Sequence, residues 1–212
     1  MNVVQGSQTP SLSADALLRL IRERRSIRRY QPSPVPRHTL ERVLEAARWG
    51  PSAHNRQPWR FVILTNRADR WRLADAMGAQ LTADLRADGL DEILIAGDAL
   101  RSRERIIAAP VLIVVCLTMR DMDTYPDEKR AEHEHTMAVQ SVAMAAQNLL
   151  LMAHAEGLGA CWMCAPLFCQ EVVRKVLDLP ADYEPQGMIL LGYPAEQRTK
   201  DREPLETRVI FK

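Results

Sequence analysis

Residues 50–64, Gly-Pro-Ser-Ala-His-Asn-Arg-Gln-Pro-Trp-Arg-Phe-Val-Ile-Leu, contain the two features that decide the fold. The part up to Pro58 sets two prolines among amide, hydroxyl and charged side chains, a composition typical of a fixed loop. The part from Trp59 to Leu64 is aromatic and β-branched and too short for a helix between breakers, which predicts a buried strand. The loop therefore runs directly into the core, where it can hold donors and acceptors in fixed positions against a planar ligand.

Outward from this stretch, apolar periodicity predicts a mixture of helices and strands. A short helix is expected around 17–21, and it ends in the basic run 24–30. Further helices are expected at about 37–49, 66–88, 90–107, 131–156 and 168–177. Further strands are expected at 110–116, 160–163, 187–191 and 208–211. The elements lack the strict alternation of parallel-sheet units, so the predicted class is α+β and not a Rossmann fold.

The helix expected at 131–156 differs from the others because it is apolar on nearly all sides. Such a helix must be surrounded by protein. Its many small residues would also allow close approach of a helix from a second subunit.

Length and charge bound the remaining possibilities. The 212 residues, 47% of them hydrophobic, suffice for one compact domain, expected at 13–212 after a flexible lead-in at 1–12. Lys and Arg number 28 and Asp and Glu 27, a formal net charge of +1, so no overall field attracts nucleic acid or an anionic membrane. Any recognition of anions must be local.

No segment predicts export, membrane insertion or a metal site. The first 13 residues lack the pattern of a signal peptide, and charges interrupt the apolar runs, so we expect a cytoplasmic protein. Cys161-x-x-Cys164 with Cys169 has no fourth zinc ligand at suitable spacing, since the nearest histidine, His154, lies on the preceding helix. Reduced thiols and no bound metal are therefore expected.

The run Arg24-Arg-Ser-Ile-Arg-Arg29 concentrates guanidinium groups and a hydroxyl in one short stretch. Guanidinium donates paired, charge-assisted hydrogen bonds to phosphate oxygens, so the run suits a phosphate. By itself it is more typical of a solvated basic helix end, where cations complement the helix dipole. The run taken alone leaves both interpretations open.

The order of these motifs resembles the nitroreductase family: Arg-Arg-Ser-x-Arg, a helix, Pro-Ser-x-x-Asn-x-Gln-Pro-Trp, a strand. The likeness continues at Gly157-Leu-Gly-Ala160 after the long helix and at Leu191-Gly-Tyr-Pro194 before a basic tail, and it spans about residues 15–212. As a set these motifs are specific. The resemblance implies a nitroreductase-like fold, with a central, mostly antiparallel sheet flanked by helices, and a domain-swapped homodimer with FMN at the subunit interface.

The resemblance also assigns expected roles. Arg24, Arg25 and Ser26 would hold the FMN phosphate together with the basic tail, Lys200 and Arg202, and Arg28 would place a cation near the flavin ring. The segment that reaches the same flavin from the other subunit corresponds to Pro51, Ser52, Ala53, Asn55 and Gln57. The turn over one ring face corresponds to Met163, Cys164 and Ala165, where many members carry Glu-Gly in place of Cys164-Ala165. No side chain acts as a nucleophile, because the flavin carries the chemistry.

The implied reaction passes hydride from NAD(P)H through FMN to an unsaturated or electron-poor small molecule. Segments such as Gly159-Ala-Cys-Trp162 and Leu179-Pro-Ala-Asp-Tyr-Glu-Pro185 resemble the C-terminal domain of FbiB, which implies reduction of the dehydro precursor of coenzyme F-420. The alternatives are a broad-specificity nitro- or quinone reductase, an FMN-cleaving enzyme of the BluB type, and a non-catalytic flavin- or deazaflavin-binding module.

Overall fold

The centre of the molecule is a four-stranded sheet. The computed structural model describes residues 13–212, so the expected lead-in at 1–12 lies outside the described residues. The strands are β1 (Trp59–Leu64), β2 (Val111–Leu117), β3 (Gly159–Met163) and β4 (Glu184–Gly192), in the order β1-β2-β4-β3. Every neighbouring pair is antiparallel, which confirms the α+β class and the mostly antiparallel sheet.

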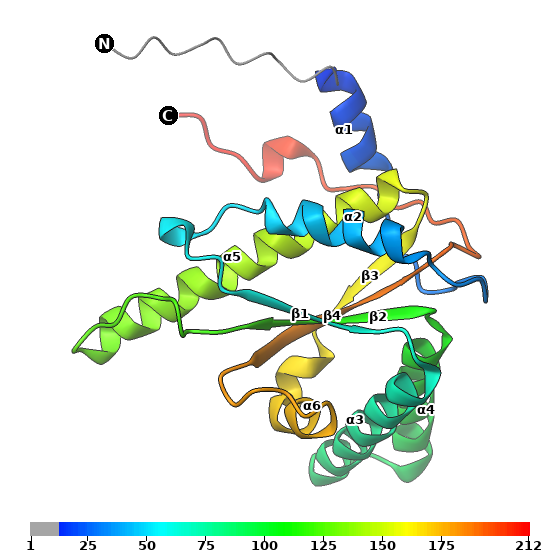
Figure 1. The fold of residues 1–212 in the computed structure, drawn as a ribbon. Helices are drawn as coiled ribbons and strands as arrows, with labels where there is room; N and C mark the ends of the chain where they lie inside the picture. The colour runs from blue at the N-terminus through cyan, green and yellow to red at the C-terminus, as the bar shows by residue number, and fades with distance from the viewer. Residues whose placement is uncertain (1–12) are drawn as a thin grey trace, which may run out of the picture.

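Strand β2 shows why the sheet lies between two layers of helices. All seven of its residues are buried. Successive side chains of a strand point to opposite faces, so Val111, Ile113 and Val115 enter one core while Leu112 and Val114 enter the other. A strand buried on both faces requires helices above and below it, as Figure 1 shows.

Helices α2 (Arg37–Arg48) and α5 (Glu128–Ala155) cover the first face. Gly50, directly after α2, allows the two to pack closely, because a Cβ on Gly50 would lie 2.7 Å from the Cα of Ala145 on α5. Helix α5 is long and apolar enough to cross a membrane by length and composition, yet six of its nine buried residues belong to the core shared with α2 and the sheet. It has the position of a core helix.

Helices α3 (Arg67–Ala87), α4 (Glu92–Ala108) and α6 (Gln170–Val176) cover the second face. The side chain of Asn66 accepts a hydrogen bond of 2.9 Å from the amide of Ala68, which confirms the predicted cap of α3. Gly89, with φ at +78°, separates α3 from α4 as expected. The Asp91 carboxylate then caps α4 through the amide of Ile93 at 2.8 Å.

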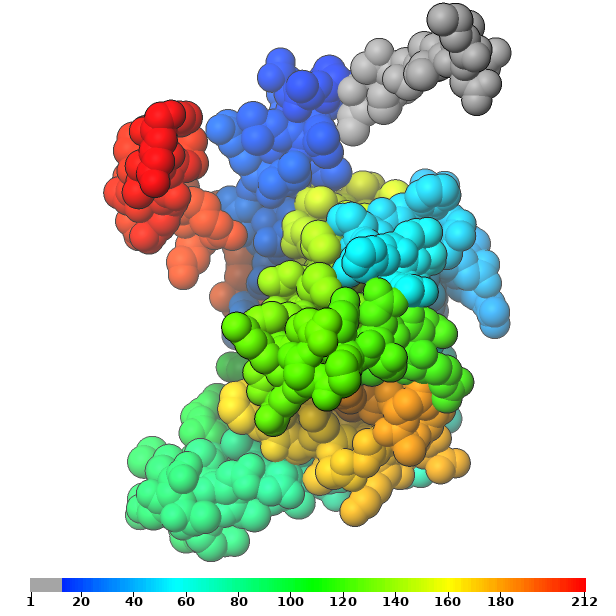
Figure 2. Space-filling model, turned by 90° about the vertical axis from the view of Figure 1, so that its left-hand side faces the viewer, coloured from blue at the N-terminus to red at the C-terminus, as the bar shows by residue number. Residues whose placement is uncertain are grey.

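The two ends of the described chain project from this body. Helix α1 (Ala14–Glu23) buries none of its own residues within the described part of the chain, and residues 205–212 at the other end also stand clear of the body (Figure 2). The strand predicted at 208–211 is wrong for the single chain, which has only a 3-10 turn, Leu205–Thr207, in this region. Because a strand forms only when a neighbour pairs with it, Ile210 and Phe211 stay 85% and 93% exposed.

Candidate functional site

The basic run lies against the exposed edge of the sheet. After α1 the chain passes beside β3, where Ser26 and Ala160 form a parallel bridge and the amide of Ile27 donates to the Ala160 carbonyl at 3.0 Å. Gly159 is required at this contact, because a Cβ there would lie 2.8 Å from the Cβ of Ile27. Gly157, with φ at +74°, ends α5 just before it. The Gly157-x-Gly159 motif therefore fixes the basic run on β3.

Glu196 connects the basic run to the C-terminal segment. Its carboxylate accepts hydrogen bonds from the backbone amides of Arg28 and Arg29, at 2.7 and 3.2 Å, and from Nη2 of Arg198 at 3.0 Å. The hydrogen bond from Arg198, supported by the two amides, lowers the pKa of Glu196 to about 2. Glu196 is therefore ionised at neutral pH and holds two distant segments together.

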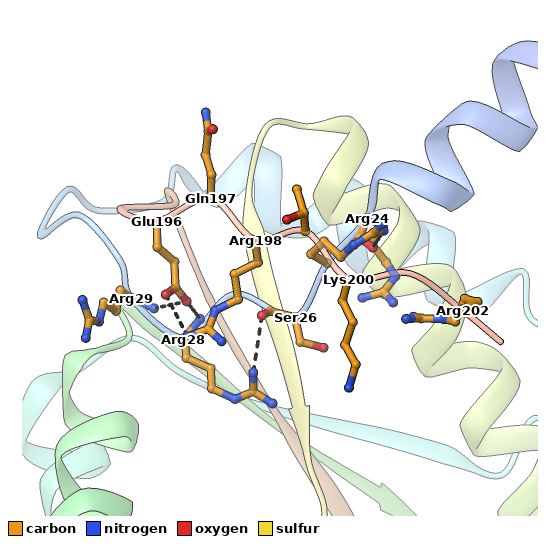
Figure 3. A pocket seen from close by; sticks show the side chains of 11 residues that line it. Arg24, Ser26, Arg28, Arg29, Glu196, Gln197, Arg198, Lys200 and Arg202 are labelled. Carbon is orange, nitrogen blue, oxygen red and sulfur yellow. Dashed lines mark hydrogen bonds and ion pairs between the residues drawn. The ribbon is translucent and has the colours of Figure 1, made fainter.

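These two segments enclose a basic pocket of about 780 Å³ (Figure 3). Seven cationic residues and one acidic residue line it. The lining residues are Arg24, Arg25, Ser26, Arg28, Arg29, Glu196, Gln197, Arg198, Thr199, Lys200 and Arg202. The basic pocket brings together six of the predicted site residues, namely Arg24, Arg25, Ser26, Arg28, Lys200 and Arg202.

Six of the seven cations of the basic pocket have no acidic partner among residues 13–212. Of the seven, only Arg198 forms an ion pair with a described residue. Twelve arginines elsewhere in residues 13–212 each pair with a carboxylate. Burial, then repulsion from Arg202 and Arg25, lowers the pKa of Arg24. Nε of Arg25 is buried without a hydrogen-bond partner in the described chain, an arrangement that an anionic ligand would complete.

A second groove of about 470 Å³ adjoins the basic pocket and shares four of its cations. It runs between α1 and α5, with Ile21 on the first helix and Gln147 on the second. The site therefore continues from the edge of the sheet to the exposed side of α5.

The loop 51–57 packs on α5 but lies outside the basic pocket. The Oγ of Ser141 accepts a hydrogen bond from the amide of Ala53 at 3.2 Å, and the Oγ of Ser52 accepts one from the amide of Gln57 at 3.1 Å. Positive φ angles at His54, Asn55 and Gln57 give the loop its sharp shape. Within the described chain, the basic pocket includes none of Pro51, Ser52, Ala53, Asn55 and Gln57.

Helical geometry places this loop and the second groove, between α1 and α5, on different sides of α5. The loop meets α5 at Ser141 and the groove meets it at Gln147, six residues later. At 3.6 residues per turn these positions point about 120° apart around the helix axis. A single chain therefore presents the loop and the groove on different sides of α5.

The turn 163–165 also lies apart from the basic pocket. Met163 ends β3, Cys164 is exposed and accepts a hydrogen bond from Nε1 of Trp162 at 3.0 Å, and Ala165 begins the 3-10 turn Ala165–Phe168. Ala165 lines a separate cavity of about 80 Å³ toward α3. Cys161, in contrast to Cys164, is buried, and residues 13–212 hold no cluster of metal-ligating side chains.

Sequence reasoning missed part of the basic pocket. The missed residues are Glu196, Gln197, Arg198 and Thr199, while Arg29 was part of the predicted basic run without a role of its own. A signal for Arg198 was present, because residues two apart in an extended segment share a face, and Arg198 lies at this spacing from the predicted Lys200 and Arg202. The role of Glu196 carried no such signal, since the two backbone amides that it binds lie more than 160 residues away.

The chain is similar to known proteins and to one family model. The model of the family described as Nitroreductase family matches residues 21–193. A Methanothermobacter thermautotrophicus protein, provisionally named NADH dehydrogenase/NAD(P)H nitroreductase, is 32% identical over 85% of this chain and 78% of its own length. An NADH dehydrogenase of Thermus thermophilus is 30% identical over 90% of this chain and 93% of its own length. The structure of a provisionally named nitroreductase from Desulfovibrio desulfuricans in complex with FMN has a TM-score of 0.70 and 27% identity, covering 97% of this chain and 98% of its own.

Proposed function

The chain belongs to the nitroreductase family, and we propose that it acts as the NAD(P)H-dependent FMN oxidoreductase which this membership implies, with the flavin phosphate in the basic pocket. Bound FMN supplies hydride transfer, from the reduced nicotinamide to an electron-poor or unsaturated small molecule. Relatives whose names include NADH dehydrogenase and nitroreductase, and a neighbour in complex with FMN, support this proposal.

The observation that carries the proposal is the unsatisfied positive charge at one end of the basic pocket. Arg24 is partly buried beside two other cations, and Nε of Arg25 has no partner in residues 13–212. A phosphate monoester brings up to about two negative charges and several acceptor oxygens. Arg24, Arg25, Ser26, Lys200 and Arg202 would hold it, and Arg28, nearer to Glu196, would place its charge beside the ring (Figure 3).

Equilibrium titration of the apoprotein with FMN tests this placement. Arg24→Gln removes one charge-assisted hydrogen-bond donor, so we expect the Kd for FMN to rise about tenfold or more. Arg37→Gln is the matched control, because Arg37 pairs with Glu41 on α2 at 2.7 Å and does not line the basic pocket. Wild-type protein that binds no FMN would refute the proposed function, and an unchanged Kd in Arg24→Gln would remove that residue from the site.

A homodimer is part of the proposal. The loop 51–57 and the turn 163–165 do not line the basic pocket of their own chain. Helix α5 leaves a stripe of exposed residues, Gln140, Ala143, Met144 and Gln147, and the C-terminal segment exposes Ile210 and Phe211. A second copy that packs along α5 would cover these apolar groups and could supply its own loop to the flavin.

For the acceptor, the finer proposal is the unsaturated deazaflavin precursor of coenzyme F-420. It rests on the segments shared with the FbiB domain, such as Leu179–Pro185, and a strongly basic pocket suits an acidic acceptor. The alternative is a broad-specificity nitro- or quinone reductase. A reaction that uses NAD(P)H, together with four free cysteines, fits the proposed cytoplasmic location.

Anaerobic absorbance spectroscopy separates these possibilities. FMN-loaded protein is expected to bleach on addition of NADPH or NADH and to recover its colour when the true acceptor is added. Recovery with the deazaflavin precursor supports the biosynthetic role, and recovery with nitroaromatics or quinones alone supports the broad reductase. A chain that binds FMN without bleaching is a binding module, and loss of FMN in the presence of oxygen indicates the BluB type.

A further inference from the structure

Two of the nine buried residues of helix α5 are polar, and neither lines the basic pocket. They are Glu134 and Ser141, with exposed fractions of 0% and 1%, and the other seven are apolar. A spacing of seven residues is close to two helical turns, so the two side chains leave the same face of α5, about 10 Å apart along its axis. This face therefore directs two polar groups into the interior.

Ser141 holds the beginning of the loop 51–57. Its Oγ donates a hydrogen bond of 2.7 Å to the Met137 carbonyl on the same helix, and it accepts one of 3.2 Å from the amide of Ala53. This first anchor of the loop on α5 is direct.

Glu134 is connected to the end of the same loop through one intermediate residue. Its Oε1 accepts a hydrogen bond of 3.1 Å from the backbone amide of Asp123, and the carboxylate of Asp123 forms an ion pair with the guanidinium of Arg56. The segments that carry Arg56 and Asp123 lie side by side at the surface, cyan and green in Figure 2. The second anchor on α5 is therefore indirect.

Two further contacts join the segment 118–123 to the residues that follow the loop. The amide of Thr118 donates to the Pro58 carbonyl at 2.9 Å, and Arg60 pairs with Asp121 at 3.0 Å. Because the segment and the loop are joined at three points, we expect them to shift together. The position of Asp123 on Glu134 then sets the position of the loop.

Fold stability alone does not explain a carboxylate at position 134. Oε2 of Glu134 is buried without a hydrogen-bond partner among residues 13–212, and a buried polar atom without a partner costs free energy. The ion pair of Arg56 and Asp123 has side chains 43% and 32% exposed, so it contributes little to stability. An apolar side chain of similar volume would avoid the cost of the buried carboxylate.

We infer that Glu134 is a positioning residue for the flavin. Through Asp123 and Arg56 it holds the loop 51–57 in the shape in which, in the proposed homodimer, the loop meets the FMN of the partner. This inference rests on the proposed function, including its homodimer. Glu134 itself does not line the basic pocket and acts on the flavin through the loop.

Four variants test the inference by FMN titration of the apoprotein. Glu134→Leu removes the acceptor for the Asp123 amide, and Glu134→Gln retains an acceptor oxygen. Asp123→Asn weakens the ion pair with Arg56 from outside the loop, at a partly exposed position where the chain is expected to fold. Glu41→Gln is the matched control, because Glu41 pairs with Arg37 on the surface of α2 at 2.7 Å.

We expect the Kd for FMN to rise about tenfold in Glu134→Leu and about threefold in Asp123→Asn, and to stay within about twofold of wild type in Glu134→Gln and Glu41→Gln. The double variant Glu134→Leu/Asp123→Asn should bind no more weakly than Glu134→Leu, because both changes interrupt the same connection. If Glu134→Leu does not fold, Asp123→Asn decides. An unchanged Kd in Asp123→Asn, or fully additive effects in the double variant, would overturn the inference.

Amide hydrogen exchange of the apoprotein separates positioning from a general loss of stability. We expect the amides of residues 53–57 to exchange about tenfold faster in Glu134→Leu and Asp123→Asn, with those of helix α2 unchanged. Faster exchange in both regions, or in neither, would contradict a local role.

Failure of the inference is distinguishable from failure of the proposed function. A loop that exchanges faster while the Kd for FMN stays unchanged refutes the positioning role alone. A wild-type chain that binds no FMN refutes the proposed function, and the exchange measurement on that apoprotein still decides whether Glu134 holds the loop.

Discussion

At the scale of single residues, Glu196 determines the shape of the basic pocket more directly than any of the cations around it. It satisfies two backbone amides of the basic run and orients Arg198 at the same time. These are hydrogen bonds to an ionised group, which are stronger than neutral ones. The carboxylate is thus a positioning residue for a site whose ligands would be anions.

We expect Glu196→Gln to lower the free energy of unfolding at pH 7, by about 1 kcal/mol. The folded pKa of Glu196, about 2, lies below its ordinary value of 4.5. A carboxylate whose pKa is lower in the folded than in the unfolded protein stabilises the fold fully at a pH above its unfolded-state pKa. This stabilisation is lost as the pH falls through the folded-state pKa. Chemical denaturation should therefore show that the difference in free energy of unfolding between wild type and variant shrinks as the pH falls from about 5 to about 2. A difference that does not depend on pH would contradict the assigned ion pair.

Among the elements, β3 depends on one close approach to the basic run. Gly159 lies where a Cβ would be 2.8 Å from that of Ile27, so any side chain there must push the basic run away from the sheet. The hydrogen bond from Ile27 to Ala160 fixes the same contact. Helix α3, by comparison, has open space around Gly78.

Substituting alanine at Gly159, where space is lacking, and at Gly78, where space is open, tests this close contact. Gly159→Ala is expected to destabilise the protein by about 1–3 kcal/mol through overpacking and to weaken FMN binding, because Ser26 and Arg28 follow the displaced segment. Gly78→Ala, inside α3 with no atom within 4 Å of the new Cβ, should instead stabilise by about 0.5–1 kcal/mol. Thermal unfolding and FMN titration measure both. Equal effects of the two substitutions would show that the contact with Ile27 does not constrain the pocket.

For the whole molecule, the two cores share one sheet, so we propose that residues 13–212 fold as a single domain. The C-terminal segment is the exception, since Leu205, Ile210 and Phe211 have little contact with the body of their own chain. In the proposed homodimer these residues would pack on the partner.

Truncation after Pro204 tests the proposed assembly. The shortened chain keeps Lys200 and Arg202 but loses the exposed apolar tail. We expect the molar mass from light scattering to correspond to a dimer for the full chain, and the dimer to dissociate at higher concentrations in the truncated chain. A full chain that is monomeric at all concentrations would refute the homodimer. A truncated chain that stays equally dimeric would place the interface on α5 alone.

Much of the fold and part of the site follow from short-range patterns. The Asn66 cap, Gly89 and the unbroken apolar run of β2 each act within a few residues, so the positions of α3, α4 and β2 were predictable. The observed ends of helices and strands differ from the predicted ones where a capping side chain or a paired strand sets the end. Helix α5 begins at Glu128 and not near 131, because the Asp127 side chain caps it, and β4 extends to Glu184 because β2 pairs with it there.

The sequence by itself determined the α+β class, the helix ends at Gly89 and Gly157, and the concentration of charge in the basic run. Each of these depends on neighbouring residues or on steric limits of the backbone. Only the tertiary structure decided that Glu196 and Arg198 join Arg28, and that the loop 51–57 lies on another side of α5. Those arrangements depend on contacts between residues far apart in the chain, whose geometry is set by how the helices and the sheet pack. The unformed strand at 208–211 has the same cause, since strand formation requires a neighbour that local sequence cannot specify.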